Sequence, residues 1–261
     1  MNSERGRWHP RIAKRSLQDT RGRRERSREM DKVRILGIVG SPRKNGNTSK
    51  LMERALEAVR TLPWVETDLF EVAGKKISHC VSCYKCMEKG QCVIRDGLYA
   101  FCEKWMAADG ILWAVPVYHM SVPSQVKALL DRFGNSVLCH YLRQGREVPR
   151  FCKAVGLLTN GASRYGGQDL TLSYLAASVI LMKGIVVSGD TFSDSYLGAA
   201  AWTGQDMNVL SEDNILRDEH GLACAQSVAR RVAEMARILK AGKAALGSDL
   251  PGEYSYTWKV E

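Results

Sequence analysis

The sequence contains no run of apolar residues long enough to cross a membrane, which takes about 20 in succession. Its longest apolar stretch, at 178–188, is interrupted by Lys183 and Gly184. Residues 1–31 have no apolar centre, so they match neither a secretory signal nor a twin-arginine export signal. We therefore expect a cytoplasmic protein with no membrane partner.

The sequence also lacks the common nucleotide-binding motifs and a convincing acid–base pair. No Gly-Lys-Ser/Thr closes a P-loop, and no G-x-G-x-x-G follows a strand pattern. His119 could donate toward a ligand, but exposure to solvent is at least as reasonable for a loop histidine. His79 adjoins Cys80, and neighbouring side chains rarely face each other. We assign no catalytic side chain.

Acidic residues are fewer than basic ones, and half of the excess positive charge lies in the N-terminal segment. The chain has a net charge of +10, and residues 1–31 contain ten Lys and Arg against five Asp and Glu. This segment has almost no apolar periodicity, so we expect a basic, disordered extension. Binding of nucleic acid is one interpretation. We favour a start at Met30, with residues 1–29 foreign to the native protein and no nucleic-acid partner, because the folded pattern begins directly after it.

The most informative motif is the segment Gly-Ser-Pro-Arg-Lys-Asn-Gly-Asn-Thr-Ser at 40–49, between a strand-like run and an amphipathic stretch. Gly46 and the small polar residues let backbone N–H groups converge on one point. Ser41, Thr48 and Ser49 add hydroxyl donors, and Arg43 adds a planar cation. The positive end of the next helix dipole faces the same point. An ordinary capped helix is the plainer interpretation, but it needs fewer donors, so the segment predicts a phosphate site.

From residue 32 onward, strand and helix patterns alternate. We expect strands at 33–39, 65–71, 110–115, 153–158 and 184–188. We expect helices at 47–61, 98–108, 124–133, 168–182 and 218–241, with a long irregular stretch at 189–213. This alternation predicts an α/β fold with a doubly wound parallel sheet. A phosphate loop after the first strand favours the flavodoxin-like order 2-1-3-4-5, with a cysteine-rich insertion at 78–97 after the second strand. The domain would span 32–242, followed by a tail at 243–261.

Two further loops would lie at the same edge of the sheet as the phosphate loop, after the third and fourth strands. The loop at 116–123 contains two prolines that stiffen it, and the loop at 159–168 contains three glycines that permit close approach to a flat ligand. Together the three loops suit a phosphorylated aromatic ligand such as FMN. Ordinary loop packing is the plainer interpretation of Tyr118 and Tyr165.

Three groups of residues resemble the NADPH-dependent FMN reductase group of flavodoxin-like proteins. They are Gly40-Ser41-Pro42-Arg43 with Gly46-Asn47-Thr48, then Pro116-Val117-Tyr118, then Lys127 with Asp131-Arg132. The resemblance covers about 32–190 and the final helix, although 189–213 is longer and less regular than the family pattern. It implies dimers or tetramers with flavin near a subunit interface. The FMN-binding residues that we expect are Ser41, Arg43, Asn47, Thr48, Ser49, Pro116, Val117, Tyr118, His119, Met120, Thr159, Asn160, Gly161 and Gly166.

Four of the eight cysteines form the run Cys80-x2-Cys83-x2-Cys86-x5-Cys92. A run this tight fits a cytosolic metal or redox site better than a disulfide framework. Thiolates three residues apart on an irregular backbone can face one cluster, and Gly90 eases the return of Cys92. Free thiols and a zinc site stay open, although zinc sites prefer two separated pairs. The remaining four, Cys102, Cys139, Cys152 and Cys224, are expected to be small buried hydrophobes.

The cysteine spacing is similar to the compact motif of the iron–sulfur flavoproteins, a branch of the same fold, and this resemblance implies a [4Fe–4S] cluster. FMN accepts two electrons and a cluster carries one, so the pair could link NAD(P)H or ferredoxin to a small acceptor such as a quinone. The sequence thus predicts an FMN-dependent oxidoreductase that forms a homodimer or homotetramer. The alternatives are an NAD(P)H-dependent FMN, quinone or azo reductase without a cluster, and a non-catalytic electron carrier. We also expect the aromatic segment 254–258 to dock on the body or on a neighbouring subunit.

Overall fold

The computed structural model describes residues 32–190, 194–206, 208, 211 and 213–250. Contacts divide the chain between Lys32 and Val33, and the unit that begins at Val33 contains every element described below. The basic extension expected at 1–31 and the aromatic segment at 254–258 lie outside the described residues. Within the described residues, no helix has both the length and the apolar character needed to cross a membrane.

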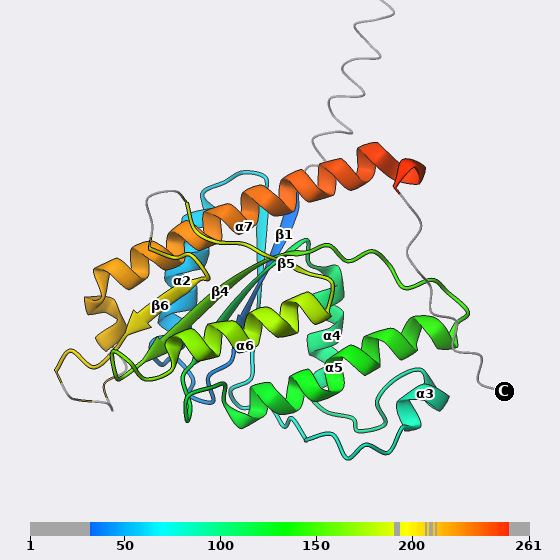
Figure 1. Ribbon diagram of the computed structural model, residues 1–261, viewed down its shortest axis with the longest axis horizontal. Coiled ribbons are helices and arrows are strands. Elements are labelled where there is room, and N and C mark those ends of the chain that lie inside the picture. Colours follow the sequence, from blue (N-terminus) through cyan, green and yellow to red (C-terminus); the bar gives the residue numbers. More distant parts are fainter. Residues whose placement is uncertain (1–31, 191–193, 207, 209–210, 212, 251–261) are drawn as a thin grey trace, which may run out of the picture. The chain divides into compact units, whose positions relative to one another are not determined.

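A parallel sheet forms the centre of this unit (Figure 1). Its main strands are β1 (Val33–Val39), β2 (Val65–Glu71), β3 (Gly110–Pro116), β4 (Ala154–Gly161) and β5 (Ile185–Val186). They are ordered β2-β1-β3-β4-β5, which confirms the predicted flavodoxin-like topology. In register, Ile35 of β1 pairs with Gly110 of β3, and Gly110 pairs with Ala154 of β4.

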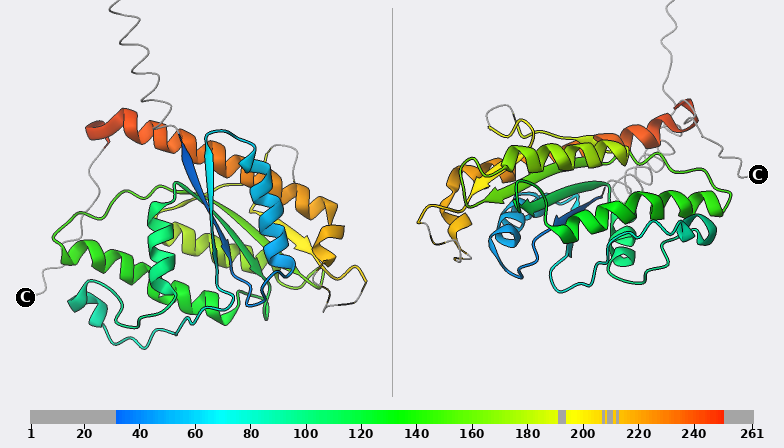
Figure 2. Two further views of the ribbon diagram at one scale, coloured as in Figure 1. Left: turned by 180° about the vertical axis from the view of Figure 1, so that it is seen from behind. Right: turned by 60° about the horizontal axis from the view of Figure 1, so that its bottom comes forward.

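Helices cover both faces of the sheet (Figure 2). α2 (Asn47–Arg60) and α7 (Glu219–Leu246) pack on one face, and α4 (Leu98–Ala107), α5 (Ser124–Arg143) and α6 (Gln168–Leu181) pack on the other. Alternate residues of β1 supply the two cores: Val33 and Ile35 join the first, and Leu36 and Ile38 join the second. This follows from the two-residue period of a strand that is buried on both faces.

The edge beyond β4 differs from the prediction. β5 is only two residues long and pairs with the start of β4, whereas β6 (Ala199–Trp202) pairs with its last four residues. Across the described part of the chain the sheet therefore has six strands rather than five. β6 lies inside the stretch expected to be irregular. Its Ala-Ala-Ala-Trp sequence has no strand periodicity, and pairing with β4 and burial of Ala199 and Ala201 hold it in place.

Two helices extend further than expected, and one was missed. α5 continues ten residues past Phe133 to Arg143, because Val137 and Tyr141 are buried in the same core as Phe133. α7 continues to Leu246 instead of ending at Ala241. The short α3 (Lys85–Lys89) lies within the cysteine-rich segment and ends at Gly90, which has a positive φ of 71°. The left-handed conformation at this position favours glycine.

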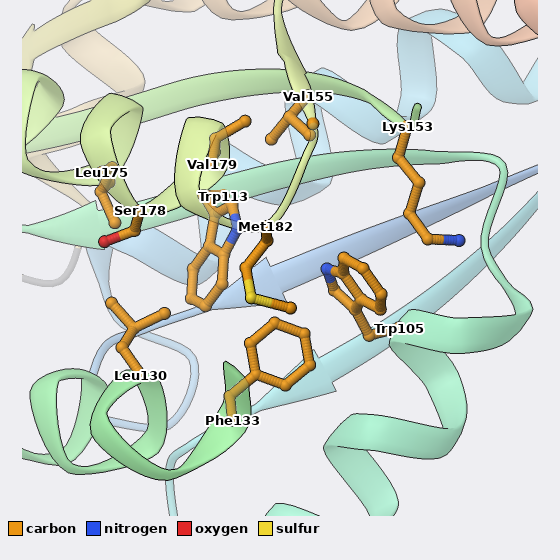
Figure 3. Close-up of a pocket in the computed structure, with 11 residues that line it drawn as sticks. Trp105, Trp113, Leu130, Phe133, Lys153, Val155, Leu175, Ser178, Val179 and Met182 are labelled. Atoms are coloured by element: carbon orange, nitrogen blue, oxygen red, sulfur yellow. The ribbon is translucent and has the colours of Figure 1, made fainter. Parts of the chain in front are cut away.

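A small cavity of about 20 Å³ lies inside the core between β3, β4 and the helices of one face (Figure 3). Trp105, Trp113 and Phe133 form part of its wall together with the buried Lys153. Lys153 Nζ donates to the carbonyl oxygens of Met106, at 3.2 Å, and of Ala108, and burial lowers its pKa to about 8. The cavity has room for about one water molecule and is far too small for a cofactor.

Candidate functional site

The loop after β1 ends at a helix start that no side chain caps. Gly46 is the N-cap of α2, it has no side chain to accept a hydrogen bond, and the first turn contains no acidic residue. Ser41 is buried, and its Oγ accepts a hydrogen bond of 3.2 Å from the backbone N–H of Arg43. The side chain of Arg43 is exposed. A helix N-terminus in this state is suited to an anion, because its N–H groups and its dipole attract negative charge.

Asn47 holds a different segment of the chain against this loop. Its Nδ2 donates to the carbonyl oxygen of Ser211 at 2.8 Å, and its Oδ1 accepts from the backbone N–H of Ile215 at 2.9 Å. The side chain of Asn47 is therefore engaged with Ser211 and Ile215, and its backbone N–H is what it can offer to a ligand. Sequence reasoning missed this tie because the two partners lie more than 160 residues away.

Hydrogen bonds join the α2 start to the ends of two other strands. Thr48 Oγ1 donates to Asn160 Oδ1 at 2.8 Å, and Ser49 Oγ donates to Glu71 Oε1 at 3.2 Å. Thr159 points elsewhere: its Oγ1 donates to the carbonyl oxygen of Val115 at 2.7 Å, and the residue is fully buried. The structure thus brings together Thr48, Ser49 and Asn160 and places the Thr159 hydroxyl against the neighbouring strand.

The loop after β3 folds into a tight reverse turn. The backbone N–H groups of Tyr118 and Ser121 each donate to the other residue's carbonyl oxygen, at 2.8 and 3.0 Å. His119 and Met120 form the centre of the turn with positive φ angles of 47° and 64°. Val117 N–H donates to the carbonyl oxygen of Asn160 at 2.9 Å, which fixes the turn to the end of β4. Tyr118, His119 and Met120 are exposed on a rigid backbone and available to a flat ligand.

The loop after β4 touches this turn. Gly167 has a φ of 102°, and a Cβ there would lie 2.7 Å from Met120 Cα, so the contact requires glycine. Gln168 closes the loop, since its Nε2 donates to the carbonyl oxygen of Ser163 at 2.5 Å and its Oε1 accepts from Gly166 N–H at 3.0 Å. Tyr165 is 98% exposed, so the ordinary packing considered for it is absent.

Trp202, at the end of β6, forms one side of the same loop. Its Nε1 donates to the carbonyl oxygen of Ala162 at 2.9 Å, and the Arg164 guanidinium lies 4.3 Å from its ring centroid. β6 pairs Trp202 with Gly161, one of the residues expected to contact flavin. Sequence reasoning missed Trp202, because a single aromatic residue in an irregular stretch carries no periodic signal.

The four clustered cysteines are only partly assembled. Cys80 and Cys83 are exposed, whereas Cys86 and Cys92 are half-buried. Among the described residues, no three metal-binding side chains converge closely enough to hold an ion. Cys86 lies beside Cys139 of α5, and burial together with this neighbouring thiol raises the pKa of Cys139 to about 11. Four thiols in one short segment still have the donor chemistry that a cluster needs.

A buried arginine of α5 fixes one end of this segment. Arg132 Nε and Nη2 lie 3.4 and 3.3 Å from Cys92 Sγ, and Nη1 lies 2.7 Å from Asp96 Oδ2. Burial alone would raise the pKa of Asp96, but hydrogen bonds from Arg132 and from the backbone N–H groups of Ser78 and Leu98 outweigh it and lower that pKa. From sequence, Arg132 was part of a family resemblance with no role assigned.

A half-open cavity of about 330 Å³ adjoins Cys92 between α4 and α5. Its wall is mostly apolar and includes Tyr99, Met106, Val137 and Tyr141. Cys102 also lines it, and burial raises the pKa of that thiol to about 12. Cys102 is thus half-buried beside Cys92 instead of fully enclosed in the core.

Residues 33–197 match the sequence model of the family described as NADPH-dependent FMN reductase. The chain belongs to this family. Its relatives include an iron-sulfur flavoprotein of Methanocaldococcus jannaschii, 32% identical over 208 residues that cover 80% of this chain and 100% of the relative. An iron-sulfur flavoprotein of Archaeoglobus fulgidus is 34% identical over 77% of this chain and 96% of its own length. A third iron-sulfur flavoprotein, from Methanosarcina thermophila, is 32% identical over 80% of this chain and 97% of its own length.

Solved structures agree on the fold of this FMN reductase family member. A flavone reductase superposes with a TM-score of 0.55 at 19% identity, covering 79% of this chain and 64% of that one. A flavodoxin, WrbA-like protein of Agrobacterium tumefaciens superposes with a TM-score of 0.50 at 19% identity, covering 79% of this chain and 98% of that one. Family membership makes the protein an FMN-dependent oxidoreductase. The uncapped start of α2 and the exposed turn at Tyr118 and Met120 fit a phosphate and a flat ring, respectively.

Proposed function

We propose that this FMN-dependent oxidoreductase passes electrons between a two-electron donor and a one-electron partner, using FMN and a [4Fe–4S] cluster. Cys80, Cys83, Cys86 and Cys92 would hold the cluster. NAD(P)H or ferredoxin would be the redox partner, with a small molecule such as a quinone as acceptor. The curated relatives named iron-sulfur flavoproteins support this assignment.

The residues for FMN divide between two ends of one site. The loop Ser41–Ser49, with the exposed Arg43 and the first backbone N–H groups of α2, would bind the phosphate. Bound FMN supplies hydride acceptance and release of single electrons. The remaining contacts would come from Pro116, Val117, Tyr118, His119, Met120, Asn160, Gly161 and Gly166, at the ends of β3 and β4.

One observation carries the cluster proposal: two N–H groups of a buried arginine are directed at the sulfur of Cys92. Donors aimed at sulfur suit a ligand that carries negative charge when iron is bound. Cys80 and Cys83 are exposed on irregular backbone, so they are free to close around the iron. Binding would then complete the fold of the segment, as in other sites whose ligands gather only with the metal.

The exposed apolar side chains of α5 and α6 favour an oligomer. Leu138 and Leu142 lie one turn apart on α5 and are 43% and 50% exposed, and Ile180 and Leu181 at the end of α6 are 65% and 76% exposed. Exposed apolar side chains in such numbers are typical of a surface that a partner covers. We include in the proposal a homodimer or homotetramer formed through these helices.

The second candidate function is an NAD(P)H-dependent FMN, quinone or azo reductase without a cluster. It is favoured by the arrangement of the described residues, in which Cys80 and Cys83 are exposed and no three metal-binding side chains lie close enough to hold an ion.

The two functions differ in the partner that receives electrons. Protein carrying its full cofactor set should reduce ferredoxin after NAD(P)H or chemical reduction of the flavin. Protein stripped of iron should keep quinone reduction and lose this one-electron exchange. Equal ferredoxin rates before and after iron removal would favour the cluster-free reductase.

A further inference from the structure

Arg132 uses every N–H group that a guanidinium has. Nε donates to Cys92 Sγ at 3.4 Å, and Nη2 donates to the same sulfur at 3.3 Å and to the carbonyl oxygen of Ile94 at 2.8 Å. Nη1 donates to the carbonyl oxygen of Ser78 at 2.9 Å and to Asp96 Oδ2 at 2.7 Å. Arginine has five such donors, and all five are directed at the cysteine-rich segment.

The surroundings make this arrangement costly unless it has a use. The side chains of Arg132 and Asp96 are each 1% exposed, so an ion pair has been taken out of water. Asp96 also accepts backbone hydrogen bonds from Ser78 and Leu98, at 2.8 and 3.1 Å, and together with the Arg132 bonds to the carbonyl oxygens of Ser78 and Ile94 these hold the loop ends. None of the bonds that hold the loop ends involves Cys92 Sγ. Holding the loop ends therefore does not explain why two Arg132 donors are directed at that sulfur.

We propose that Arg132 is the positioning residue of the cluster: it anchors Cys92 as the pre-set ligand and raises the reduction potential of the bound iron–sulfur centre. This inference rests on the proposed function and assigns a role within it. Reduction adds one electron to the cluster and one negative charge close to the Cys92 sulfur. A buried cation and two N–H···S hydrogen bonds stabilise that added charge more than they stabilise the oxidised state. The cluster of this chain is therefore easier to reduce than it would be without Arg132.

Two substitutions separate the charge from the hydrogen bonds. Arg132→Met removes both, whereas Arg132→Lys keeps the charge and the pairing with Asp96 but loses the planar fork that reaches the sulfur. Arg95→Met is the matched control, because Arg95 belongs to the same segment and its guanidinium lies 4.7 Å from the Tyr99 ring centroid instead of on sulfur. Each variant is prepared anaerobically as the full chain with FMN and cluster, and the cluster is followed by electron paramagnetic resonance in a redox titration.

We compare the ratio of reduced to oxidised cluster at the midpoint reduction potential of the wild type. In Arg132→Met this ratio should fall about tenfold or more, which corresponds to a midpoint potential lower by about 59 mV for a one-electron couple. Arg132→Lys should give a smaller fall in the same direction, and Arg95→Met should match the wild type. Iron should also be lost to a chelator faster from both Arg132 variants, with FMN retained. If Arg132→Met does not fold or does not hold iron, the midpoint potential and the rate of iron loss of Arg132→Lys test the inference.

Two results would overturn the inference in distinguishable ways. If the wild type holds a cluster and the Arg132 variants that retain iron have its midpoint, Arg132 is a structural clamp and the role proposed here is wrong, while the proposed function stands. If the anaerobic wild type contains no iron, the proposed function fails and this inference fails with it.

Discussion

Thr48 Oγ1 donates a hydrogen bond of 2.8 Å to Asn160 Oδ1, joining the first turn of α2 to the end of β4 across 112 positions of sequence. Both residues are buried, with 2% and 6% of their surfaces exposed. Asn160 also accepts a backbone hydrogen bond from Val117 through its carbonyl oxygen. One residue therefore links the proposed phosphate loop to the loop that would contact the isoalloxazine ring.

Replacing Thr48 with valine tests this link. The substitution keeps the shape of the side chain but leaves Asn160 Oδ1 without its buried donor, at a cost of about 1–3 kcal/mol in the free energy of unfolding. FMN affinity should fall as well, because the two loops are no longer held together. Thr48→Ser keeps the hydroxyl and is the control. Denaturant unfolding of the apoprotein and an FMN titration give both quantities, and a Thr48→Val protein equal to wild type in both would show that the bond is incidental.

Arg43 should provide binding energy through the FMN phosphate alone. We expect Arg43→Ala to weaken FMN binding by about 1.5–3 kcal/mol, the scale of a hydrogen bond to a charged group. Binding of riboflavin, which lacks the phosphate, should be weak and unchanged. Lys44→Ala in the same loop controls for the general loss of positive charge. Wild-type protein that binds riboflavin and FMN equally well in a fluorescence titration would refute the phosphate site.

Cys83→Ala should separate the two redox centres. Iron and sulfide should be lost while FMN stays bound, because the phosphate loop follows a different strand from the cysteine segment. Exchange of electrons with ferredoxin should collapse, and direct chemical reduction of flavin should survive. Cys152→Ser, outside the segment, is the control, and the oligomer mass is measured in both variants. A Cys83→Ala protein that exchanges electrons at the wild-type rate would count against the cluster.

Lys153 should make stability rise with pH in the alkaline range. Its folded pKa, about 8, lies below the ordinary 10.5, so between these values the unfolded chain binds more protons and rising pH favours the folded state. From pH 7 to pH 10 the wild type should gain about 2 kcal/mol relative to Lys153→Met, which has no such group. Denaturant unfolding of both proteins at the two pH values measures the difference. No change in that difference would show that Lys153 titrates normally.

The apolar side chains on α5 should mediate association. We expect light scattering to give at least a dimer at micromolar concentration, and we expect Leu138→Glu with Leu142→Glu to shift the protein toward the monomer, because charges are then forced into an apolar contact. Leu216→Glu, on a different part of the surface, is the control. A wild-type protein that is monomeric under these conditions would exclude the proposed oligomer.

Sequence patterns predicted the strands that pair with a neighbour along their whole length. β1 and β2 have the predicted limits, and each of the seven residues of one pairs with a residue of the other. Predictions failed where distant contacts decide the outcome. Gly134 follows the expected end of α5, yet burial of Val137 and Tyr141 carries the helix onward. β6 depends on pairing with β4, which no local pattern in residues 199–202 reveals.

The candidate site shows the same division. The composition of 40–49 indicated an anion site, and the structure supplies an uncapped helix start there. The partners of Asn47 and Arg132 could not be predicted, since they lie at least 36 residues away in sequence. The fold decides which partners such side chains bind. Composition alone does not distinguish them from surface residues.

We propose that this one chain carries FMN and an iron–sulfur cluster together. The most direct test is the content of iron, acid-labile sulfide and FMN in protein purified without oxygen. A [4Fe–4S] cluster beside one flavin predicts about four iron and four sulfide per FMN. Protein that contains FMN but no iron or sulfide would contradict the account and leave a cluster-free flavin reductase in its place.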